Sequence, residues 1–234
     1  MSNVLLGLFF SIIIACGALV KKSLTISGFI AAIILGTSVF YFGGVFLSAI
    51  MVAFFVSSGI LSKFNKHSKA FTKDIHEKTG GRDYAQVLAN GGTGLAFSAL
   101  WFYTKNPLCL VAYAVSFAAA TSDTWASEVG VLSKAEPISV LSFKKVEKGV
   151  SGAISLLGTF SAILGAGFIA TTFLIGYIML FGYNIKAIIY FAAVAVFGFS
   201  GCILDSILGA TLQGKYSCEV CGKLTEKRIH HNRK

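Results

Sequence analysis

Residues 187–213 read AIIYFAAVAVFGFSGCILDSILGATLQ, and this stretch decides how the rest of the chain is interpreted. A transmembrane helix needs about 17–25 predominantly apolar residues, and this run supplies them with a single carboxylate, Asp205. Asp205 lies about two helical turns before the end of the run, which is too deep for a simple cap. A carboxylate at membrane depth is costly and by default marks an ion, proton or substrate site. The alternative is a lone polar group that is hydrogen-bonded between helices.

The composition of the whole chain is typical of a membrane protein. Of 234 residues, 55% are hydrophobic and only 13% are charged, whereas a soluble domain of this length needs a larger polar surface. We therefore expect an all-α fold, a polytopic transmembrane helical bundle over residues 1–213, followed by a basic cytoplasmic tail over 214–234. The seven predicted spans are roughly 4–20, 25–42, 44–61, 84–103, 107–122, 152–181 and 187–213.

The distribution of charge predicts the orientation. All but two of the 20 basic residues lie in alternate connections or in the tail, and the exceptions are Lys105 and Lys186. The positive-inside rule then places the N-terminus outside and the C-terminus in the cytoplasm. The ten acidic residues also lie in the cytoplasmic connections or near the inner helix ends. The sequence therefore predicts a protein of the cell's inner (plasma) membrane whose active face is cytoplasmic.

The net charge of +10 has two compatible explanations. Topology and attraction to anionic membrane lipids account for it without a further partner. It also suits a basic funnel for a phosphorylated substrate. We expect no nucleic-acid partner.

The first polar segment runs from Glu77 to Gly94 and contains Gly80-Gly81 just before the predicted span at 84–103. Glycines before a helix start allow backbone N–H groups to approach a phosphate, and Arg82 could clamp that phosphate with two hydrogen bonds. Gln86 and Asn90 are four residues apart and share a helix face. In the alternative, Asn90 bonds a neighbouring helix and the glycines only permit close packing.

The second segment, residues 121–130, reads TSDTWASEVG. If it is helical, Asp123, Ser127 and Gly130 lie along one stripe, and Glu128 lies about 140° away from Asp123. A carboxylate with a hydroxyl one turn further along suits a hard cation. In the alternative, Asp123 is the N-cap of a following helix.

Two further segments supply cations and hydroxyls. Lys144, Lys145 and Lys148 precede a Gly-Val-Ser-Gly sequence that contains Ser151, and such a combination predicts an anion site. The alternative for these lysines is a basic anchor beside the membrane. The fourth segment joins Asp205 to Ser206 and, two turns further along the same stripe, to Gln213.

These segments are expected to converge at one membrane face. The predicted spans at 107–122 and 187–213 run in the same direction, so Asp123 and Asp205 approach the same leaflet. Two neighbouring carboxylates repel each other unless a cation lies between them. Magnesium accepts one or two carboxylates and completes its coordination with water and substrate phosphates. The sequence therefore predicts a Mg²⁺ site at Asp123 and Asp205, suited to phosphoryl or nucleotidyl transfer.

The tail offers a second candidate metal site. Cys218 and Cys221 form a Cys-x-x-Cys pair followed by glycine, with His230 and His231 downstream. This arrangement resembles a zinc knuckle, so the two thiols are candidate ligands of a Zn²⁺ ion. The alternative is a pair of reduced thiols in a cytoplasmic tail.

These residues together resemble the integral membrane family catalogued as domain of unknown function 92, which includes the plant phytyl-phosphate kinases. The resemblance covers most of the chain and rests on QVLANGG at 86–92, SDTWASEVG at 122–130 and DSILGA at 205–210. More distantly, DTxAxxxG at 123–130 and KKVExGxxG at 144–152 are similar to CTP-dependent polyprenol kinases and phosphatidate cytidylyltransferases.

The resemblance implies a membrane transferase that moves a phosphoryl group from a nucleoside triphosphate to an isoprenoid monophosphate such as phytyl or polyprenyl phosphate. CTP is the expected donor, and ATP stays an alternative. It implies magnesium at Asp123 and Asp205. The other catalytic residues that it implies are Asn90, Lys144 and Lys145. The predicted substrate-binding residues are Arg82, Gln86, Ser127, Glu128, Lys148, Ser151, Ser206 and Gln213. The competing functions are a lipid-phosphate cytidylyltransferase, a small ion or metabolite transporter, and a non-catalytic lipid-binding protein.

Overall fold

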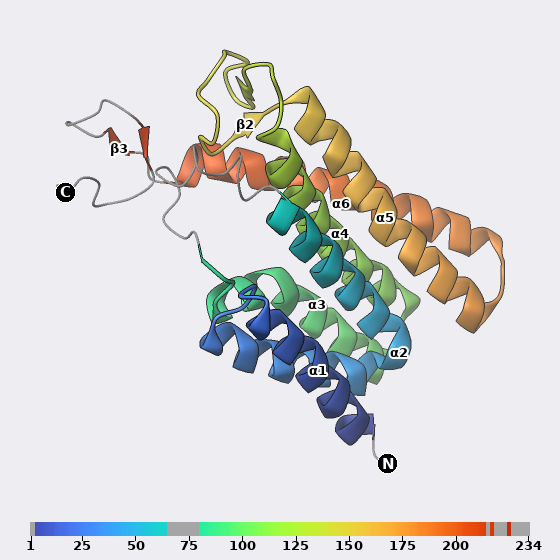
Figure 1. Ribbon diagram of the computed structural model, residues 1–234. Coiled ribbons are helices and arrows are strands. Elements are labelled where there is room, and N and C mark those ends of the chain that lie inside the picture. Colours follow the sequence, from blue (N-terminus) through green and yellow to red (C-terminus); the bar gives the residue numbers. More distant parts are fainter. Residues whose placement is uncertain (1–2, 65–79, 214–215, 218–223, 226–234) are drawn as a thin grey trace.

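The computed structural model describes residues 3–64, 80–213, 216–217 and 224–225. Most of this chain is helical, as predicted, and the helices form a bundle (Figure 1). The helices are α1 (Asn3–Val20), α2 (Ile26–Phe64), α3 (Tyr84–Thr104), α4 (Pro107–Gly130), α5 (Leu156–Phe181) and α6 (Ile185–Leu212). Four two-residue strands accompany them, namely β1 (Ile138–Ser139), β2 (Ala153–Ile154), β3 (Tyr216–Ser217) and β4 (Leu224–Thr225).

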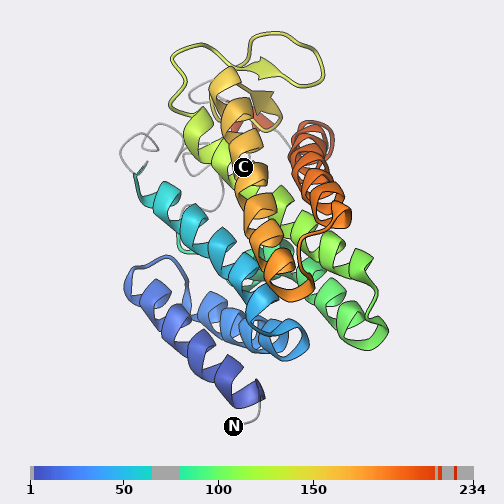
Figure 2. The same cartoon turned by 90° about the vertical axis from the view of Figure 1, so that its right-hand side faces the viewer.

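Helix α2 reverses direction at Gly44, where the sequence predicted a boundary between two spans. Gly44 has φ 61° and ψ −153°, a conformation that residues with a side chain rarely adopt. The two halves of α2, residues 26–43 and 45–64, lie side by side and run in opposite directions (Figures 1 and 2). The reversal allows a single element to supply two neighbouring rods of the bundle.

Within the described ranges, five helices are long and apolar enough to cross a membrane, namely α1, α2, α4, α5 and α6. Helix α3 does not meet both of these criteria, and α2 counts as one element in spite of its reversal. The membrane class and the helical fold are therefore confirmed, whereas the seven crossings and the orientation of the termini stay predictions. Many large apolar side chains are exposed, such as Leu156 and Met179, as expected for helices that face lipid.

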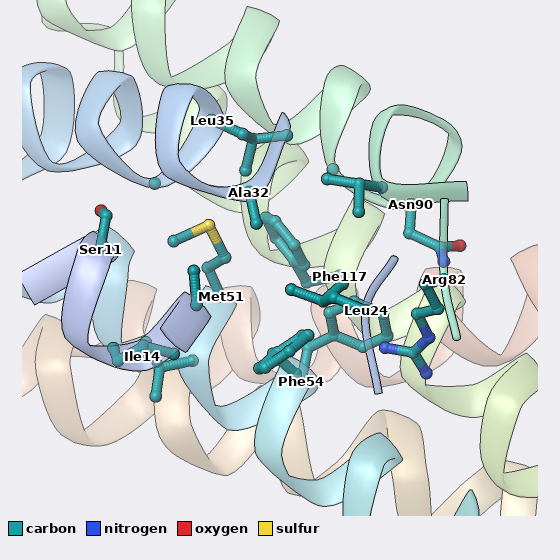
Figure 3. Close-up of a pocket in the computed structure, with 16 residues that line it drawn as sticks. Ser11, Ile14, Leu24, Ala32, Leu35, Met51, Phe54, Arg82, Asn90 and Phe117 are labelled. Carbon is teal, nitrogen blue, oxygen red and sulfur yellow. The ribbon is translucent and has the colours of Figure 1, made fainter. Parts of the chain in front are cut away.

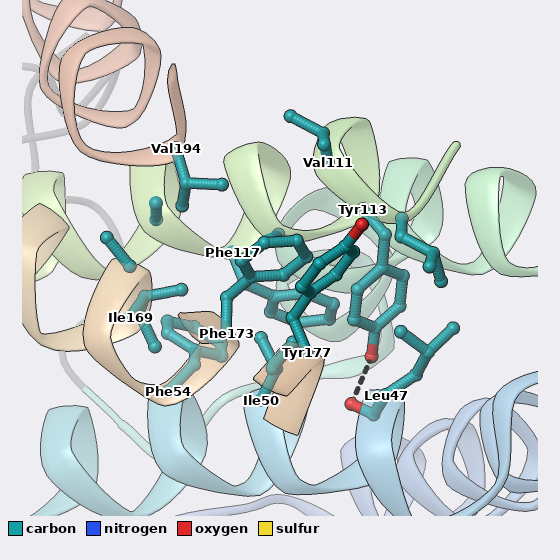
Figure 4. Close-up of a cluster of buried hydrophobic side chains, with 14 of the residues drawn as sticks. Leu47, Ile50, Phe54, Val111, Tyr113, Phe117, Ile169, Phe173, Tyr177 and Val194 are labelled. Atoms are coloured by element: carbon teal, nitrogen blue, oxygen red, sulfur yellow. Dashed lines mark hydrogen bonds between the residues drawn. The ribbon is translucent and has the colours of Figure 1, made fainter. Parts of the chain in front are cut away.

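The largest core cluster lies between the second half of α2 and helices α4 and α5, with contributions from α6 (Figure 4). Phe117 and Tyr113 of α4 and Phe173 of α5 are fully buried there. The Tyr113 hydroxyl donates a 2.7 Å hydrogen bond to the carbonyl of Leu47, so this buried polar atom is satisfied. Because α4 packs against α2, α3, α5 and α6, it is the central helix of the bundle.

Two predicted boundaries were wrong. Helix α4 continues to Gly130 instead of ending at 122, because the polar residues that follow residue 122 can still form backbone hydrogen bonds of a helix. Asp123 therefore lies inside α4, and the alternative that it caps a following helix was also wrong. Helix α5 begins at Leu156 and not at 152, since Ser155 caps it by accepting a 3.1 Å hydrogen bond from the Gly158 amide.

The connection between α4 and α5, residues 131–155, is a compact loop. Its strands β1 and β2 pair antiparallel, with Ile138 opposite Ile154 and Ser139 opposite Ala153. Gly152 has φ 81°, and a Cβ atom added there would collide with Ala210 of α6. Gly152 thus allows the loop to lie directly on α6.

Candidate functional site

Helices α4 and α6 approach each other closely through glycines of α6. A Cβ atom added at Gly201 would lie 2.6 Å from Cβ of Ala119, and one added at Gly198 would collide with Ala118. Small residues allow helix backbones to come this close. Asp123 lies four residues after Ala119, and Asp205 lies four residues after Gly201, so each carboxylate occupies the next turn of the same stripe.

The two carboxylates lie within electrostatic reach of each other, as the sequence predicted. Asp123 is half-buried and Asp205 is exposed. The buried thiol of Cys202 lies against the Ser122 hydroxyl and interacts with both carboxylates. The Ser122 hydroxyl also donates a 2.7 Å hydrogen bond to the carbonyl of Ala162 in α5, which fixes this part of α4. We call Asp123 and Asp205 the carboxylate pair.

The carboxylate pair could hold magnesium, which stays a prediction. Two like charges in a partly desolvated place favour protonation of one of them or the presence of a cation. Among the residues that the structure describes, no group of three or more His, Cys, Asp or Glu side chains is arranged to hold a metal ion. A site with only two carboxylates suits Mg²⁺, which keeps water and substrate phosphates as its other ligands.

The loop reaches α6 beside the carboxylate pair. The Ser151 hydroxyl donates a 2.7 Å hydrogen bond to Oε1 of Gln213. A Cβ atom at Gly152 would lie 3.0 Å from the carbonyl oxygen of Ser206, the residue next to Asp205. Three predicted substrate-binding residues, Ser151, Ser206 and Gln213, are therefore gathered in one place, although the loop and the end of α6 are far apart in sequence.

The three lysines of the loop differ in their surroundings. Lys148 donates a 2.6 Å hydrogen bond from Nζ to the carbonyl of Ser133, which holds the loop together. Lys145 pairs with Glu136 at 3.0 Å, and both side chains are exposed, at 77% and 64%. Lys144 is also exposed. Lys144 and Lys145 are thus available at the surface of the loop, whereas Lys148 has a structural contact within it.

A second polar cluster forms on another face of α4, around Glu128. This residue is only 6% exposed, and its Oε1 accepts a 2.6 Å hydrogen bond from the hydroxyl of Ser62 at the end of α2. The Arg82 guanidinium lies over the rings of Phe54 and Phe55, 5.5 and 6.0 Å from their centres. Burial lowers the pKa of Arg82, and the nearby Glu128 carboxylate opposes that decrease.

The backbone of Arg82 is anchored to the connection between α1 and α2. Its amide donates a 2.9 Å hydrogen bond to the carbonyl of Ser23, and its carbonyl accepts a 3.1 Å hydrogen bond from the amide of Thr25. A Cβ atom at Gly81 would lie 2.9 Å from the carbonyl carbon of Leu24. Gly81 therefore serves close packing here, which is the alternative that the sequence left open.

Three other predicted residues of these segments have local partners. Gln86 belongs to a capping box at the start of α3, in which its side chain accepts from the Asp83 amide at 3.2 Å. The Ser127 hydroxyl donates to the carbonyl of Thr124 within α4 at 3.1 Å. Asn90 is half-buried and lines a cavity together with Arg82. The assignment of all these residues to substrate binding or catalysis stays a prediction.

We call this cavity the α1–α4 cavity. It is lined by α1, both halves of α2, α3 and α4, and it has a volume of about 90 Å³. Its lining is apolar apart from a few groups, and Figure 3 shows Arg82 and Asn90 at one end and Ser11 at the other. Phe117 and Glu128 are eleven residues apart, about three turns, so they share a face of α4. The cavity and the Arg82 cluster are therefore on one face, and the carboxylate pair is on another.

Sequence reasoning missed several of these partners. Ser62 ends an apolar span with no motif around it, and Cys202 looks like any small residue of a membrane helix. Cys202 and Asp205 are three residues apart, which indicates that they share a helix face. Only the packing of α6 against α4 shows which side chains of α4 that face contacts. The thiols of Cys218 and Cys221, the candidate zinc ligands, lie outside the described residues.

Comparison with known proteins places these residues in a family. The model of the family described as integral membrane protein DUF92 matches residues 9–234. The chain is 37% identical to an uncharacterized membrane protein of Methanocaldococcus jannaschii, over 90% of this chain and 85% of that protein. It is 32% identical to Protein PGR of Arabidopsis thaliana, over 93% and 81% of the two chains.

A more distant relative is the chloroplastic Protein VTE6 of Arabidopsis thaliana, 27% identical over 65% of this chain and 47% of that protein. No solved structure matched the chain.

Proposed function

This chain belongs to the integral membrane family DUF92, and we propose on that premise that it transfers a phosphoryl group from a nucleoside triphosphate to an isoprenoid monophosphate. CTP is the proposed donor, and phytyl or polyprenyl phosphate is the proposed acceptor. The resemblance of its motifs to a family that includes phytyl-phosphate kinases supports this choice of substrates. The observation that carries the proposal is the carboxylate pair, Asp123 and Asp205.

The proposed transfer needs no general base. An oxygen of the acceptor's phosphate forms a bond to the γ-phosphorus, while the bond from that phosphorus to the β,γ-bridging oxygen breaks. The products are a lipid diphosphate and a nucleoside diphosphate, and no proton has to move. Catalysis of such a transfer consists of positioning the reactants and of stabilising charge.

Different residues of this chain would position the reactants and stabilise their charge. Asp123 and Asp205 would hold Mg²⁺, which neutralises charge on the donor's phosphates when bound. Lys144 and Lys145 carry exposed positive charge on the loop, which supports a role in attracting the nucleotide. The hydrogen bond from Ser151 to Gln213 holds the loop next to Ser206 and Asp205, which supports a shared substrate site.

The proposed topology places this chemistry in the cytoplasm. Seven crossings, with the two halves of α2 counted separately, bring the end of α2, the start of α3 and the ends of α4 and α6 to the inner face. The basic residues concentrate at these ends, which supports the assignment through the positive-inside rule. The site would then open toward the cytoplasmic pool of nucleoside triphosphates.

The deciding experiment incubates the purified protein in detergent with Mg²⁺, γ-labelled CTP or ATP, and phytyl or polyprenyl monophosphate. A labelled lipid diphosphate is the expected product. A product that carries the nucleotide base would replace the proposal with cytidylyl transfer. If no lipid product forms from any donor while the protein remains folded, the proposal of a transferase is wrong, and a transporter becomes the leading alternative.

A further inference from the structure

The α1–α4 cavity has a polar end and an apolar body. Arg82 and Asn90 lie at one end, near the start of α3 (Figure 3). From there the lining continues through Leu24, Ala32 and Phe54 toward Ser11 in the middle of α1. An apolar cavity that ends at a cation suits an amphiphile with one anionic head.

The cavity has room for part of one lipid chain. A water-sized group needs roughly 10–15 Å³ of such volume. The cavity of about 90 Å³ therefore holds roughly six to nine groups of the size of a methylene. That is enough for a segment of one narrow chain.

Arg82 has donors to spare for an anion. A guanidinium carries five N–H donors, and one carboxylate engages at most two of them in a bidentate pair. The Glu128 carboxylate lies near enough to interact with Arg82. A phosphate can therefore bind the other donors while Glu128 keeps the guanidinium oriented. Lys21 and Lys22, which directly follow α1, add positive charge at this end of the bundle.

The start of α3 does not compete with Arg82 for that anion. Asp83 accepts a 2.9 Å hydrogen bond from the Gln86 amide, and Gln86 accepts one from the Asp83 amide at 3.2 Å. Because this capping box satisfies these amides and places a carboxylate at the helix start, the helix terminus is not the anion site here. Arg82 and Asn90 are then the polar groups that line this end of the cavity.

We propose that the α1–α4 cavity binds the apolar chain of a single-chain lipid monophosphate, with Arg82 and Asn90 contacting its phosphate. The inference rests on the proposed function, and it places the chain of the acceptor between α1, α2, α3 and α4. Glu128 lies five residues after Asp123, about 7.5 Å along the axis of α4 and about 140° around it. The phosphate held by Arg82 and the carboxylate pair therefore lie on different faces of α4, near the same end of the helix.

A binding experiment tests this without turnover. The full chain in nanodiscs is titrated with farnesyl monophosphate, farnesol and dioleoyl phosphatidate, in the absence of nucleotide and magnesium. The monophosphate is expected to bind at least tenfold more tightly than the other two. Equal affinity for phosphatidate would overturn the single-chain assignment, and equal affinity for farnesol would overturn the role of Arg82.

Two matched substitutions add bulk inside and outside the cavity. Ala32→Phe fills the cavity and is expected to weaken binding of the monophosphate at least tenfold. Gly17→Phe adds the same ring to α1 at a place where a new Cβ atom meets nothing within 4 Å, and it should leave the affinity within twofold. Unchanged affinity in Ala32→Phe would overturn the proposal.

The role of Arg82 is tested with a double substitution, because its guanidinium lies near the Glu128 carboxylate. Removing Arg82 alone would change the charge balance beside the buried Glu128 carboxylate. The double variant Arg82→Gln with Glu128→Gln avoids that imbalance, and it should bind the monophosphate at least tenfold more weakly. Glu128→Gln alone, which keeps the guanidinium, is expected to retain most of the affinity. Full affinity in the double variant would remove Arg82 from the site.

A photo-crosslinking measurement keeps the proposal testable if Ala32→Phe does not fold. A monophosphate with a diazirine at the end of its chain is expected to label α1 or the two halves of α2 near Ser11, Gly36 or Met51. Adducts confined to α5 or α6 would overturn the proposal. If labelling and binding hold while no donor gives a lipid product, the proposed phosphoryl transfer fails and the cavity assignment stands.

Discussion

Asp123 of α4 and Asp205 of α6 lie at matching depth, each about two turns before the end of its helix, and their carboxylates interact across the α4–α6 contact. The contact of Gly201 with Ala119 one turn earlier sets this arrangement. Four predictions follow from the pair and from the loop beside it.

Replacing either carboxylate by an amide is expected to abolish turnover. Asp123→Asn and Asp205→Asn each remove a proposed metal ligand, and a loss of at least 100-fold in kcat is expected from the size of such electrostatic contributions. The measurement is the initial rate of lipid diphosphate formation, with size-exclusion profiles to show that each variant is folded. Lys186→Gln is the control, because this charged residue lies at the start of α6, at the opposite end of that helix from Asp205. Turnover that survives in Asp123→Asn would contradict the site assignment.

Magnesium is expected to stabilise the wild-type protein against heat, with no substrate present. A ligand at 100 times its Kd adds about 2.7 kcal/mol to the stability of a protein that binds it only when folded. Asp205→Asn should lose most of this gain, and its melting temperature without magnesium should not fall, because a repulsion has been removed. The measurement is thermal unfolding in detergent across a Mg²⁺ titration. An equal magnesium-dependent shift in both proteins would place the ion elsewhere.

Gly152→Ala is expected to destabilise the contact between the loop and α6. The residue has φ 81°, and a Cβ atom there collides with Ala210, so backbone strain of about 1–3 kcal/mol and a displaced loop are expected. Hydrogen exchange around Ser151 and turnover report the displacement. Gly167→Ala in α5 is the matched control, because a Cβ atom there meets nothing within 4 Å. The control should be neutral or slightly stabilising, since alanine favours a helix.

The exposed lysines are expected to affect the binding of nucleotide and not the stability of the fold. Lys144→Gln with Lys145→Gln should raise the KM for nucleotide three- to tenfold at low salt, and the difference should shrink at high salt because exposed charges are screened. Stability should change by less than about 1 kcal/mol, since an exposed ion pair contributes little. Lys186→Gln, at the opposite end of the bundle, is the control. A loss confined to kcat would show that these lysines act in the transition state.

Local patterns in the sequence predicted the elements well. Apolar runs of sufficient length placed helices close to α1, α3, α5 and α6, and they placed a boundary beside Gly44, where α2 reverses. The predicted membrane span at 107–122 ended too early, because it stopped where the sequence becomes polar. The segment after residue 122 is polar, yet it continues α4 to Gly130, because its polar side chains do not prevent backbone hydrogen bonding.

The sequence by itself determined the class of the protein, the carboxylates at helix ends and the concentration of charge on one face, because hydropathy and charge are properties of single segments. Only the tertiary structure decided that Glu128 belongs with Ser62 and Arg82 and not with the carboxylate pair. The tertiary structure also decided that α1, α2, α3 and α4 line one cavity, with Arg82 at one end and Ser11 at the other. The physical reason is that helix rotation, set by which small residues allow close approach, chooses which side chains meet across long stretches of chain.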